Sequence, residues 1–299
     1  MPLLGFDDLY QAADRSAAAV SVVAAGGADR TVLEALRVAC DRHWIAPIVS
    51  GQESQIRRLA DDCGVPLDGF TILDSDEPAH AAVASVRSGQ AQCLMKGQIA
   101  TPDLMRAVLD AGHGLRTVRV ICQVPLVEIR SSGRRLLLAD TGICIAPTLE
   151  QRIDIIASSV KLAQALGAEV PRVALLSATE KVSESMPDTL EAAEITRRNR
   201  SGEIGGCLVE GPLSFDLAYA AEAGEKKQIA GSVIGQADVL IFPNLLSANL
   251  TIKAIMYTAD CRYGGVLCGA ACPVVFMSRA DDAPTRLNSL ALVLRLLSV

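Results

Sequence analysis

Short runs of β-branched and aliphatic residues alternate with longer helical patterns from one end of this chain to the other. Parallel strands need crossover connections that are long enough to hold a helix, so this alternation is typical of a mostly parallel sheet covered by helices. The sequence therefore predicts an α/β fold. We expect strands at residues 20–24, 47–50, 92–95, 119–124, 173–177, 207–209, 239–242, 265–268 and 274–277.

Two helix starts have the spacing of a capping box, in which a threonine is followed three residues later by Glu or Gln. Thr31 predicts the start of a helix that runs to residue 41, and Thr148 predicts the start of one that runs to residue 166. Gly167 then supplies a C-terminal stop. A last helix is expected over residues 284–297, where leucine and alanine recur on a face that should pack on the sheet.

The composition supports a large core, since 50% of the 299 residues are apolar and 21% are charged. At about 150 residues per domain, this length predicts two domains. We place the boundary near residue 140, between a basic stretch at 130–135 and the turn at Pro147. The net charge of -6 and the aromatic content of 3% argue against a nucleic-acid partner, which needs basic residues and aromatic stacking.

Nine cysteines form no C-x-x-C pair and lie mostly in apolar runs, which is typical of reduced thiols in a cytoplasmic protein. The first residues lack the basic and apolar regions of a signal peptide, and no run of about 18 uncharged apolar residues predicts a membrane span. The three histidines have no metal-ligand spacing to one another or to Cys and acidic residues. We therefore expect no metal site and no membrane partner.

Lys96 and Gly97 directly follow the expected strand at 92–95, and Thr101 and Pro102 follow five residues later. This order predicts a strand, a loop and a helix, with Thr101 as the N-cap and Pro102 at the first helical position. A loop that enters a helix N-terminus presents unpaired N–H groups to an anion, and Lys96 adds a full positive charge. The spacing is not that of an ATP-binding P-loop, and an ordinary strand-to-helix turn explains the same residues.

Ser278, Arg279, Asp281 and Asp282 follow the last expected strand. An arginine and a hydroxyl at this place can hold a phosphate, because a guanidinium matches its oxygens bidentately, and a neighbouring carboxylate can accept a proton. The alternative is structural. Asp281 or Asp282 would then cap the last helix and pair with Arg279.

Two further segments follow expected strands, residues 210–216 and residues 241–253. Ligands collect at the carboxyl ends of strands in open α/β sheets, so both segments are candidates for a binding site. In the first segment, Ser214 or Asp216 can also be a simple helix cap.

In this order the segments resemble the phosphate acetyltransferase and phosphate butyryltransferase family, and most closely its butyryl-type branch. The resemblance spans nearly the whole chain. It rests on residues 94–97 with Thr101, 114–117, 139–140, 145–147, 171–177, 211–216, 242–245 with Asn249 and Lys253, and 278–281.

The resemblance implies a two-domain fold like that of the isocitrate and isopropylmalate dehydrogenases, with mostly parallel sheets and the active site in the interdomain cleft. Residues 1–139 with 264–299 would form the first domain and residues 140–263 the second. The implied reaction converts an acyl-CoA and phosphate into an acyl phosphate and free CoA, reversibly. Coenzyme A is then a substrate, no cofactor is covalently bound, no metal is needed for the chemistry, and a homodimer or higher homo-oligomer is the usual assembly.

The resemblance also assigns roles to residues. Arg279 would hold the phosphoryl group, and Ser278 would hydrogen-bond the thiolate or the developing oxyanion. Asp281 and Asp282 would be the nearby candidates for the general base. Family members that favour acetyl groups carry an aspartate seven residues after the serine, where this chain has Thr285. Substrate contacts are assigned to Lys96, Gly97, Thr101, Arg116, Asp140, Gly211, Pro212, Asp216, Asn249 and Lys253.

Two departures from the butyryl-type pattern concern the acyl preference. Cys122 and Gln123 stand where relatives usually have Ser-His, and Leu246 to Asn249 replace Glu-Ala-Gly-Asn. They leave open the interpretation that the chain is a non-catalytic homologue that binds CoA or an acyl phosphate, although the presence of Ser278, Arg279 and Asp281 together argues against it. A decarboxylating dehydrogenase on the same fold would need a carboxylate cluster for Mg²⁺, and the sequence offers none.

Overall fold

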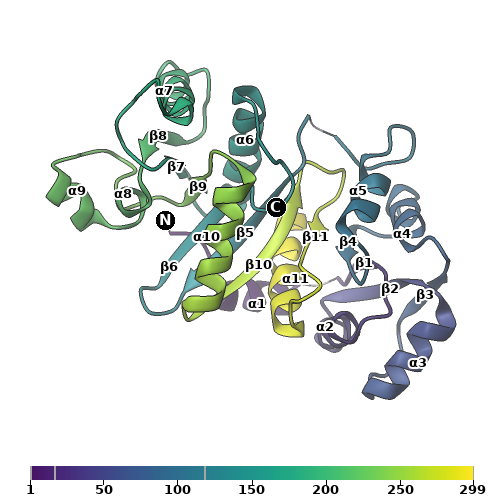
Figure 1. Ribbon diagram of the computed structural model, residues 1–299. Helices are drawn as coiled ribbons and strands as arrows, with labels where there is room; N and C mark the ends of the chain where they lie inside the picture. The colour runs from purple at the N-terminus through teal and green to yellow at the C-terminus, as the bar shows by residue number, and fades with distance from the viewer. Residues whose placement is uncertain (1, 17, 118, 299) are drawn as a thin grey trace. The chain divides into compact units, whose positions relative to one another are not determined.

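The computed structural model describes residues 2–16, 18–117 and 119–298. Its contacts divide the chain into two compact units, each described here by itself (Figure 1). Unit 1 consists of Met1–Gly5 and Arg119–Arg262, and unit 2 consists of Phe6–Val118 and Tyr263–Val299. The domain bounds expected at residues 139/140 and 263/264 stay a prediction.

Unit 2 contains a mostly parallel sheet in the order β3-β2-β1-β4-β11-β10, in which β10 and β11 are antiparallel. Its strands are β1 (Val20–Ala25), β2 (Ile45–Gly51), β3 (Thr71–Asp74), β4 (Cys93–Lys96), β11 (Val274–Val275) and most of β10 (Cys261–Cys268). Its helices are α1 (Phe6–Asp14), α2 (Arg30–Asp41), α3 (Glu53–Cys63), α4 (Pro78–Arg87), α5 (Thr101–Leu109) and α11 (Ala283–Leu297).

Unit 1 contains strands in the order β5-β6-β9-β7-β8, in which β5 and β6 form an antiparallel pair and the others are parallel. Its strands are β5 (Cys122–Ile129), β6 (Arg134–Ala139), β7 (Arg172–Leu176), β8 (Leu208–Leu213) and β9 (Val239–Ile241). Its helices are α6 (Leu149–Ala165), α7 (Pro187–Arg200), α8 (Phe215–Tyr219), α9 (Ala221–Lys227) and α10 (Leu245–Thr258).

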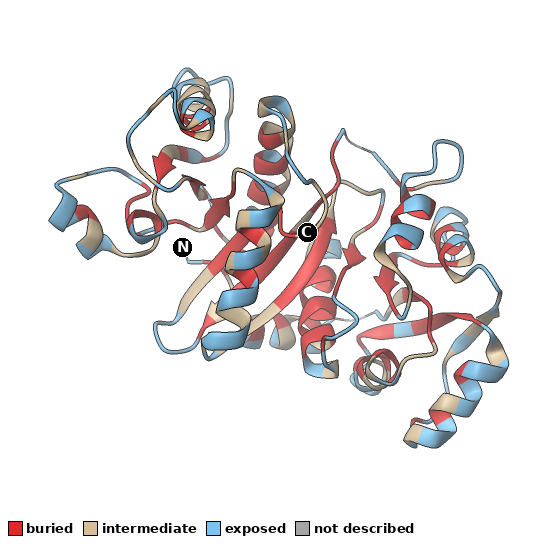
Figure 2. Ribbon diagram, in the orientation of Figure 1, coloured by how far each residue is buried: buried red, intermediate tan, exposed pale blue. Residues whose placement is uncertain are grey.

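The strands and the helix faces that cover them form the core, as the buried residues in Figure 2 show. In unit 2, α11 packs against α1 and α2, and it buries an unbroken run from residue 288 to residue 294. Each Å² of apolar surface that such a helix face removes from water stabilises the fold by about 25 cal/mol. The expectation of a last helix that packs firmly is confirmed.

The α/β prediction is confirmed, and each expected strand overlaps an observed one. Two strands were not expected, β3 and β6. The strand expected at 119–124 begins later, at Cys122, and runs to Ile129.

The helix caps were predicted with mixed success. Thr148 forms the expected capping box, and Gly167 follows the helix end with φ +98. Thr31 is not the N-cap of α2, because Asp29 takes that position and its carboxylate accepts the N–H of Val32 at 2.9 Å. Thr101 is not an N-cap either, since it is the first residue of α5.

Candidate active site

Lys96 and Ser278 come from distant parts of the sequence but lie at one edge of the sheet in unit 2. Strand β4 ends at Lys96, and β11 pairs with β4 in parallel before the chain reaches Ser278. The carboxyl ends of adjacent parallel strands lie at the same edge, which is where ligands bind in open α/β sheets. Two of the segments selected from the sequence therefore meet in unit 2.

Lys96 is only 2% exposed. Its burial, together with the positive charges of Arg286 and Arg279, lowers the pKa of the ammonium group to about 8, while Asp281 and Asp29 oppose this shift. Burial is the main cause of the shift, so the charged ammonium lacks solvent, and no carboxylate in the described part of the chain pairs with it to replace that solvent. A bound dianion would supply such a partner.

Gly97 allows the loop after β4 to approach the backbone that follows β1. A Cβ atom on Gly97 would lie 2.2 Å from the carbonyl oxygen of Gly26, so no other residue fits without a shift. The N–H of Gly97 donates to the carbonyl of Ala25 at 2.9 Å. Thr101 is half-buried at the start of α5, as the loop enters the helix.

Asp281 holds the loop that carries Ser278 and Arg279. One oxygen of its carboxylate accepts the backbone N–H of Ser278 at 2.6 Å, and the other accepts the hydroxyl of Tyr263. Burial and the nearby Asp281 raise the pKa of Tyr263 well above its usual value, so the phenol stays a donor.

Arg279 is exposed, and no hydrogen bond or ion pair of its side chain to another described residue is found. The pairing with an aspartate that the sequence left open is therefore not observed. Asp282 is the N-cap of α11, where its carboxylate accepts the N–H of Thr285 at 2.9 Å. The guanidinium of Arg279 is thus available to a ligand.

Arg286 is a member of this cluster that the sequence did not indicate. It is fully buried, and its guanidinium donates to Thr31 Oγ1 at 2.8 Å, to the Lys96 carbonyl at 3.4 Å and to the Ser278 carbonyl at 3.3 Å. One side chain therefore ties the end of β4 and the loop after β11 to the start of α2. The signal available in the sequence was a charged residue four positions before Leu290 on the apolar face of the last helix.

Asp140 organises the turn that follows β6 in unit 1. Its Oδ1 accepts the N–H groups of Gln123, Gly142 and Ile143 at 3.0, 2.9 and 3.2 Å, and its Oδ2 accepts that of Cys144 at 2.7 Å. Burial raises the pKa of the carboxyl group, and these hydrogen bonds oppose that shift. Both carboxylate oxygens are thus engaged by the backbone.

Asn249 contacts the same turn from α10. Its Nδ2 donates to the carbonyl of Thr141 at 3.1 Å, and Lys253 lies exposed one turn further along the helix. The structure thus brings Asn249 to the Asp140 turn within unit 1.

Gly211 and Pro212 lie in β8, and a Cβ atom on Gly211 would come within 2.5 Å of the Leu175 Cβ on β7. Asp216 lies in α8 and pairs with Lys227 at 2.9 Å. A hydrogen bond from the Ser214 hydroxyl and the Lys227 ammonium lower the pKa of Asp216 to about 2. Ser214 occupies the N-cap position of α8 but makes no side-chain cap bond.

Arg116 lies in unit 2, exposed in the loop after α5, where it forms an isolated bridge with Ala270. Unit 2 therefore holds Lys96, Gly97, Thr101, Arg116, Ser278, Arg279 and Asp281, and unit 1 holds Asp140, Gly211, Pro212, Asp216, Asn249 and Lys253.

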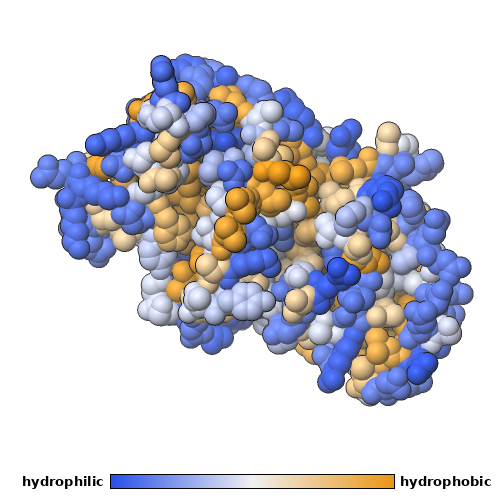
Figure 3. Space-filling model, viewed as in Figure 1, coloured by the Kyte–Doolittle hydropathy of each residue, from blue (hydrophilic) through white to orange (hydrophobic). Residues whose placement is uncertain are grey.

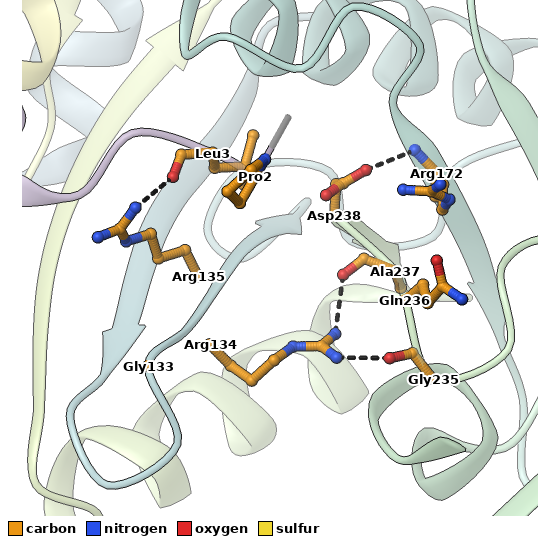
Figure 4. A pocket seen from close by; sticks show the side chains of 10 residues that line it. All are labelled: Pro2, Leu3, Gly133, Arg134, Arg135, Arg172, Gly235, Gln236, Ala237 and Asp238. Atoms are coloured by element: carbon orange, nitrogen blue, oxygen red, sulfur yellow. Dashed lines mark hydrogen bonds between the residues drawn. The ribbon is translucent and has the colours of Figure 1, made fainter.

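A hollow of about 400 Å³ lies at the amino ends of the unit 1 strands and contains several arginines (Figure 4). The guanidinium of Arg134 donates to the carbonyls of Gly235 and Ala237 at 2.5 and 3.0 Å, and that of Arg135 donates to the Leu3 carbonyl at 2.7 Å. These arginines hold the surrounding backbone, so this hollow is not favoured as the active site.

Exposed apolar side chains gather on α10 and beside its N-terminus in unit 1 (Figure 3). Ile145, Leu246 and Leu250 are 76%, 69% and 61% exposed.

Across the described ranges, no group of three or more His, Cys, Asp or Glu residues could hold a metal ion. No helix in the described part of the chain has the length and apolar character needed to cross a membrane.

Residues 75–294 match the family model described as "Phosphate acetyl/butaryl transferase". The chain belongs to this family. It is 38% identical over 266 residues to the phosphate acetyltransferase of Thermotoga maritima, covering 88% of this chain and 90% of that protein. It is 37% identical over 274 residues to the phosphate butyryltransferase of Clostridium acetobutylicum, covering 91% of each. The resemblance drawn from the sequence is confirmed, and the chain is a phosphate acyltransferase.

The fold agrees with this assignment. The crystal structure of a branched-chain phosphotransacylase from Enterococcus faecalis superposes with a TM-score of 0.82 at 30% identity, covering 92% of this chain and 98% of that one. The α/β fold with its mostly parallel sheet is therefore that of a phosphotransacylase.

Proposed function

We propose that this chain interconverts a short-chain acyl-CoA and inorganic phosphate with an acyl phosphate and free CoA. The observation that carries the proposal is the cation cluster of unit 2. The buried ammonium of Lys96 lies within the electrostatic reach of Arg279 and Arg286, and Arg286 donates to the backbone carbonyl of Ser278 at 3.3 Å. This arrangement suits a phosphate dianion, because each cation is stabilised by the negative charge that the ligand brings.

The chemistry follows from these groups. A phosphate oxygen attacks the thioester carbonyl, a tetrahedral oxyanion forms, and the C–S bond breaks to release the thiolate of CoA. Arg279 would bind two phosphate oxygens with its planar fork, and Lys96 would add a point charge. Ser278 would donate its hydroxyl to the oxyanion or the thiolate, and one such preorganised donor is worth about 2.7–4 kcal/mol in the transition state.

In the reverse direction a carboxylate near the thiol would act as general base, since an unperturbed thiol has a pKa of about 8.5. Asp281 and Asp282 are the candidates named from the sequence, and the carboxylate of Asp282 caps α11. The two oxygens of Asp281 accept the Tyr263 hydroxyl and the Ser278 N–H, which supports a role in positioning the loop. We propose that Asp281 acts through Ser278 and Arg279.

The finer expectations belong to this proposal and rest on the family resemblance. The fold would be of the isocitrate/isopropylmalate dehydrogenase type, with residues of both units acting on one substrate. The chemistry would need no metal. The protein would form a homodimer or higher homo-oligomer and would be located in the cytoplasm. Asp140, Asn249 and Lys253 would then supply the unit 1 contacts to acyl-CoA.

The experiment is a thiol-release assay with acetyl-, butyryl- and isobutyryl-CoA, with and without phosphate, before and after exhaustive chelation of divalent metals. We expect CoA release that depends on phosphate and survives chelation. Equal release without phosphate would identify a thioesterase. Binding of CoA without any release would support the non-catalytic homologue that the altered Gln123 and Leu246 positions left open.

A further inference from the structure

Asp29 and Thr31 lie at the N-terminus of α2, next to the loop that carries Lys96. Strand β1 pairs in parallel with β4 as far as Lys96, so the loops that follow these strands leave the same edge of the sheet. The N–H of Gln98 donates to the carbonyl of Gly26 at 2.8 Å and joins the two loops. Asp29 and Thr31 are therefore held beside the cation cluster of unit 2, although the sequence assigned neither of them a role in the site.

A chain of hydrogen bonds connects Asp29 to the buried Arg286. The Nε of Arg286 donates to Thr31 Oγ1 at 2.8 Å, and the hydroxyl of Thr31 donates in turn to Asp29 Oδ1 at 2.7 Å. The same carboxylate oxygen accepts the N–H of Val32 at 2.9 Å, which fixes Asp29 at the helix start. Thr31 thus links a charged donor to a charged acceptor, and hydrogen bonds to charged groups are among the stronger ones.

Arg286 depends on this link because its other hydrogen bonds go to backbone carbonyls. Its Nη atoms donate to the carbonyls of Lys96 and Ser278 at 3.4 and 3.3 Å, and a carbonyl brings no full negative charge. Burial lowers the pKa of Arg286, and Asp29 is the largest of the charges that oppose this shift, ahead of Asp281. The Asp29 side therefore supports the guanidinium that holds both carbonyls.

Four charged groups act on the ammonium of Lys96. The cations are Arg286 on α11 and Arg279 in the loop after β11, and the carboxylates are Asp281 in that same loop and Asp29 before α2. Charges act on one another without contact, and partly buried charges are screened much less than exposed ones. Asp29 is therefore a fixed negative charge behind the cluster, outside the loop that carries Arg279.

We propose that Asp29 and Thr31 are positioning residues of the phosphate site. The inference rests on the proposed function for the identity of the anion. Thr31 orients the guanidinium of Arg286, and Asp29 supplies a negative charge that favours the protonated form of Lys96. Both residues act through these two cations, and neither touches the substrate.

The first test is Asp29→Asn, which removes the charge and keeps the helix cap. Asparagine is as good an N-cap as aspartate, and its side-chain oxygen can still accept the N–H of Val32 and the hydroxyl of Thr31. The matched control is Asp74→Asn, at an exposed carboxylate that accepts the N–H of Glu53 at 2.9 Å at the start of α3. The dissociation constant of inorganic phosphate is measured by calorimetry from about pH 6 to about pH 9.5.

Without the carboxylate of Asp29, the ammonium of Lys96 should lose its proton at a lower pH. We therefore expect the pH at which phosphate binding weakens to fall from about 8 by about half a unit or more. At about pH 6, where Lys96 is protonated in both proteins, the variant should bind phosphate at least as tightly as wild type, because a negative charge near the anion is gone. Asp74→Asn should match wild type throughout, and the ionisation of phosphate itself affects all three proteins equally.

The second test separates the hydroxyl of Thr31 from its shape. Thr31→Val has nearly the same volume but cannot link Arg286 to Asp29, whereas Thr31→Ser keeps the link. Thr189→Val is the control for lost stability, since it removes a buried hydroxyl that donates to the carbonyl of Met186 at 2.6 Å near the start of α7 in unit 1. At a temperature at which all variants are folded, we expect kcat/KM for phosphate to fall by about tenfold in Thr31→Val and to stay within about twofold of wild type in Thr31→Ser and Thr189→Val.

An unshifted midpoint in Asp29→Asn, or phosphate binding weakened equally at every pH, would overturn the role of the Asp29 charge. A near-wild-type rate in Thr31→Val, or equal damage in Thr31→Ser and Thr31→Val, would overturn the positioning role of Thr31. A wild-type protein that binds phosphate but releases no CoA would contradict the proposed function, whereas a shifted midpoint in Asp29→Asn would still support this inference. The two failures are therefore distinguishable.

Discussion

Tyr263 donates its hydroxyl to the carboxylate of Asp281, and the other oxygen of that carboxylate accepts the backbone N–H of Ser278 at 2.6 Å. Asp281 is 8% exposed, and both of its oxygens have a protein donor. A general base must reach the proton that it removes, within about 3 Å or through one water. This geometry favours an aspartate that positions the Ser278 loop.

Asp281→Asn tests that role with little change in shape. The asparagine oxygen can still accept the Ser278 N–H, and its NH₂ group can donate to the Tyr263 oxygen. We expect kcat to fall by no more than about tenfold with an unchanged pH profile, and Asp281→Ala to be far more damaging. Loss of a general base costs about 10²–10⁴-fold, so a drop of that size in Asp281→Asn would assign proton transfer to Asp281.

Arg279→Lys separates bidentate phosphate binding from simple charge. The side chain is exposed and its neighbours Asp281 and Asp282 are engaged elsewhere, so the substitution should leave the melting temperature within about 2 °C of wild type. We expect kcat/KM for phosphate to fall by about 10²-fold or more, because lysine keeps the charge but loses the planar fork.

The control for this variant is Arg106→Lys, at an exposed arginine of α5 that pairs with Asp103 at 3.1 Å. It should change neither stability nor kcat/KM measurably. A near-wild-type rate in Arg279→Lys would remove Arg279 from the phosphate site.

The lowered pKa of Lys96 predicts that phosphate binding depends on pH. Burial and the charges of Arg286 and Arg279 lower its pKa from 10.5 to about 8, so the folded protein loses this proton more readily than the unfolded chain. Between about pH 8 and pH 10.5 the unfolded state binds more protons, and the contribution of Lys96 to stability therefore rises with pH in this range. Phosphate favours the charged form and opposes the shift.

We therefore expect the dissociation constant of phosphate to increase as the pH rises through about 8. Calorimetric titrations from about pH 7 to about pH 9.5 would measure it. Lys96→Met should bind phosphate more weakly at neutral pH and should lose most of this dependence. A wild-type dissociation constant that stays constant over the range would show that Lys96 does not face the anion.

The sequence predicted those parts of the fold that leave a local signal. Apolar runs such as the one that ends at Lys96 are buried strands, and a buried strand is recognisable without its partners. Strand β3 was not predicted because it is short and partly exposed. Strand β6 was not predicted because it begins with Arg134 and Arg135 in a stretch that resembles a boundary loop. Asp29 replaced Thr31 as a cap because both residues suit that position and only the backbone geometry decides.

The candidate site was predictable where its residues follow a strand directly. Lys96, Ser278 and Arg279 met that condition, and the parallel pairing of β4 with β11 accounts for their proximity. Tyr263 and Arg286 did not, since each acts through hydrogen bonds to residues that only the tertiary fold brings near. Long-range polar contacts of this kind have no periodic signature in a sequence.

Arg286→Met tests whether this buried arginine supports the site. Its guanidinium is the donor to Thr31 Oγ1 and to the carbonyls of Lys96 and Ser278, so its loss leaves buried acceptors unpaired. We expect the free energy of unfolding to fall by about 3 kcal/mol, against less than about 0.5 kcal/mol for the exposed control Arg106→Met.

The same variant has an electrostatic consequence that a purely structural role would not produce. Because the charge of Arg286 contributes to the lowered pKa of Lys96, Arg286→Met should move that pKa back toward 10.5. The pH at which phosphate binding weakens should then shift upward from about 8 in the same calorimetric titration. A destabilised variant with an unshifted midpoint would mean that Arg286 holds the fold without acting on the charge of the phosphate site.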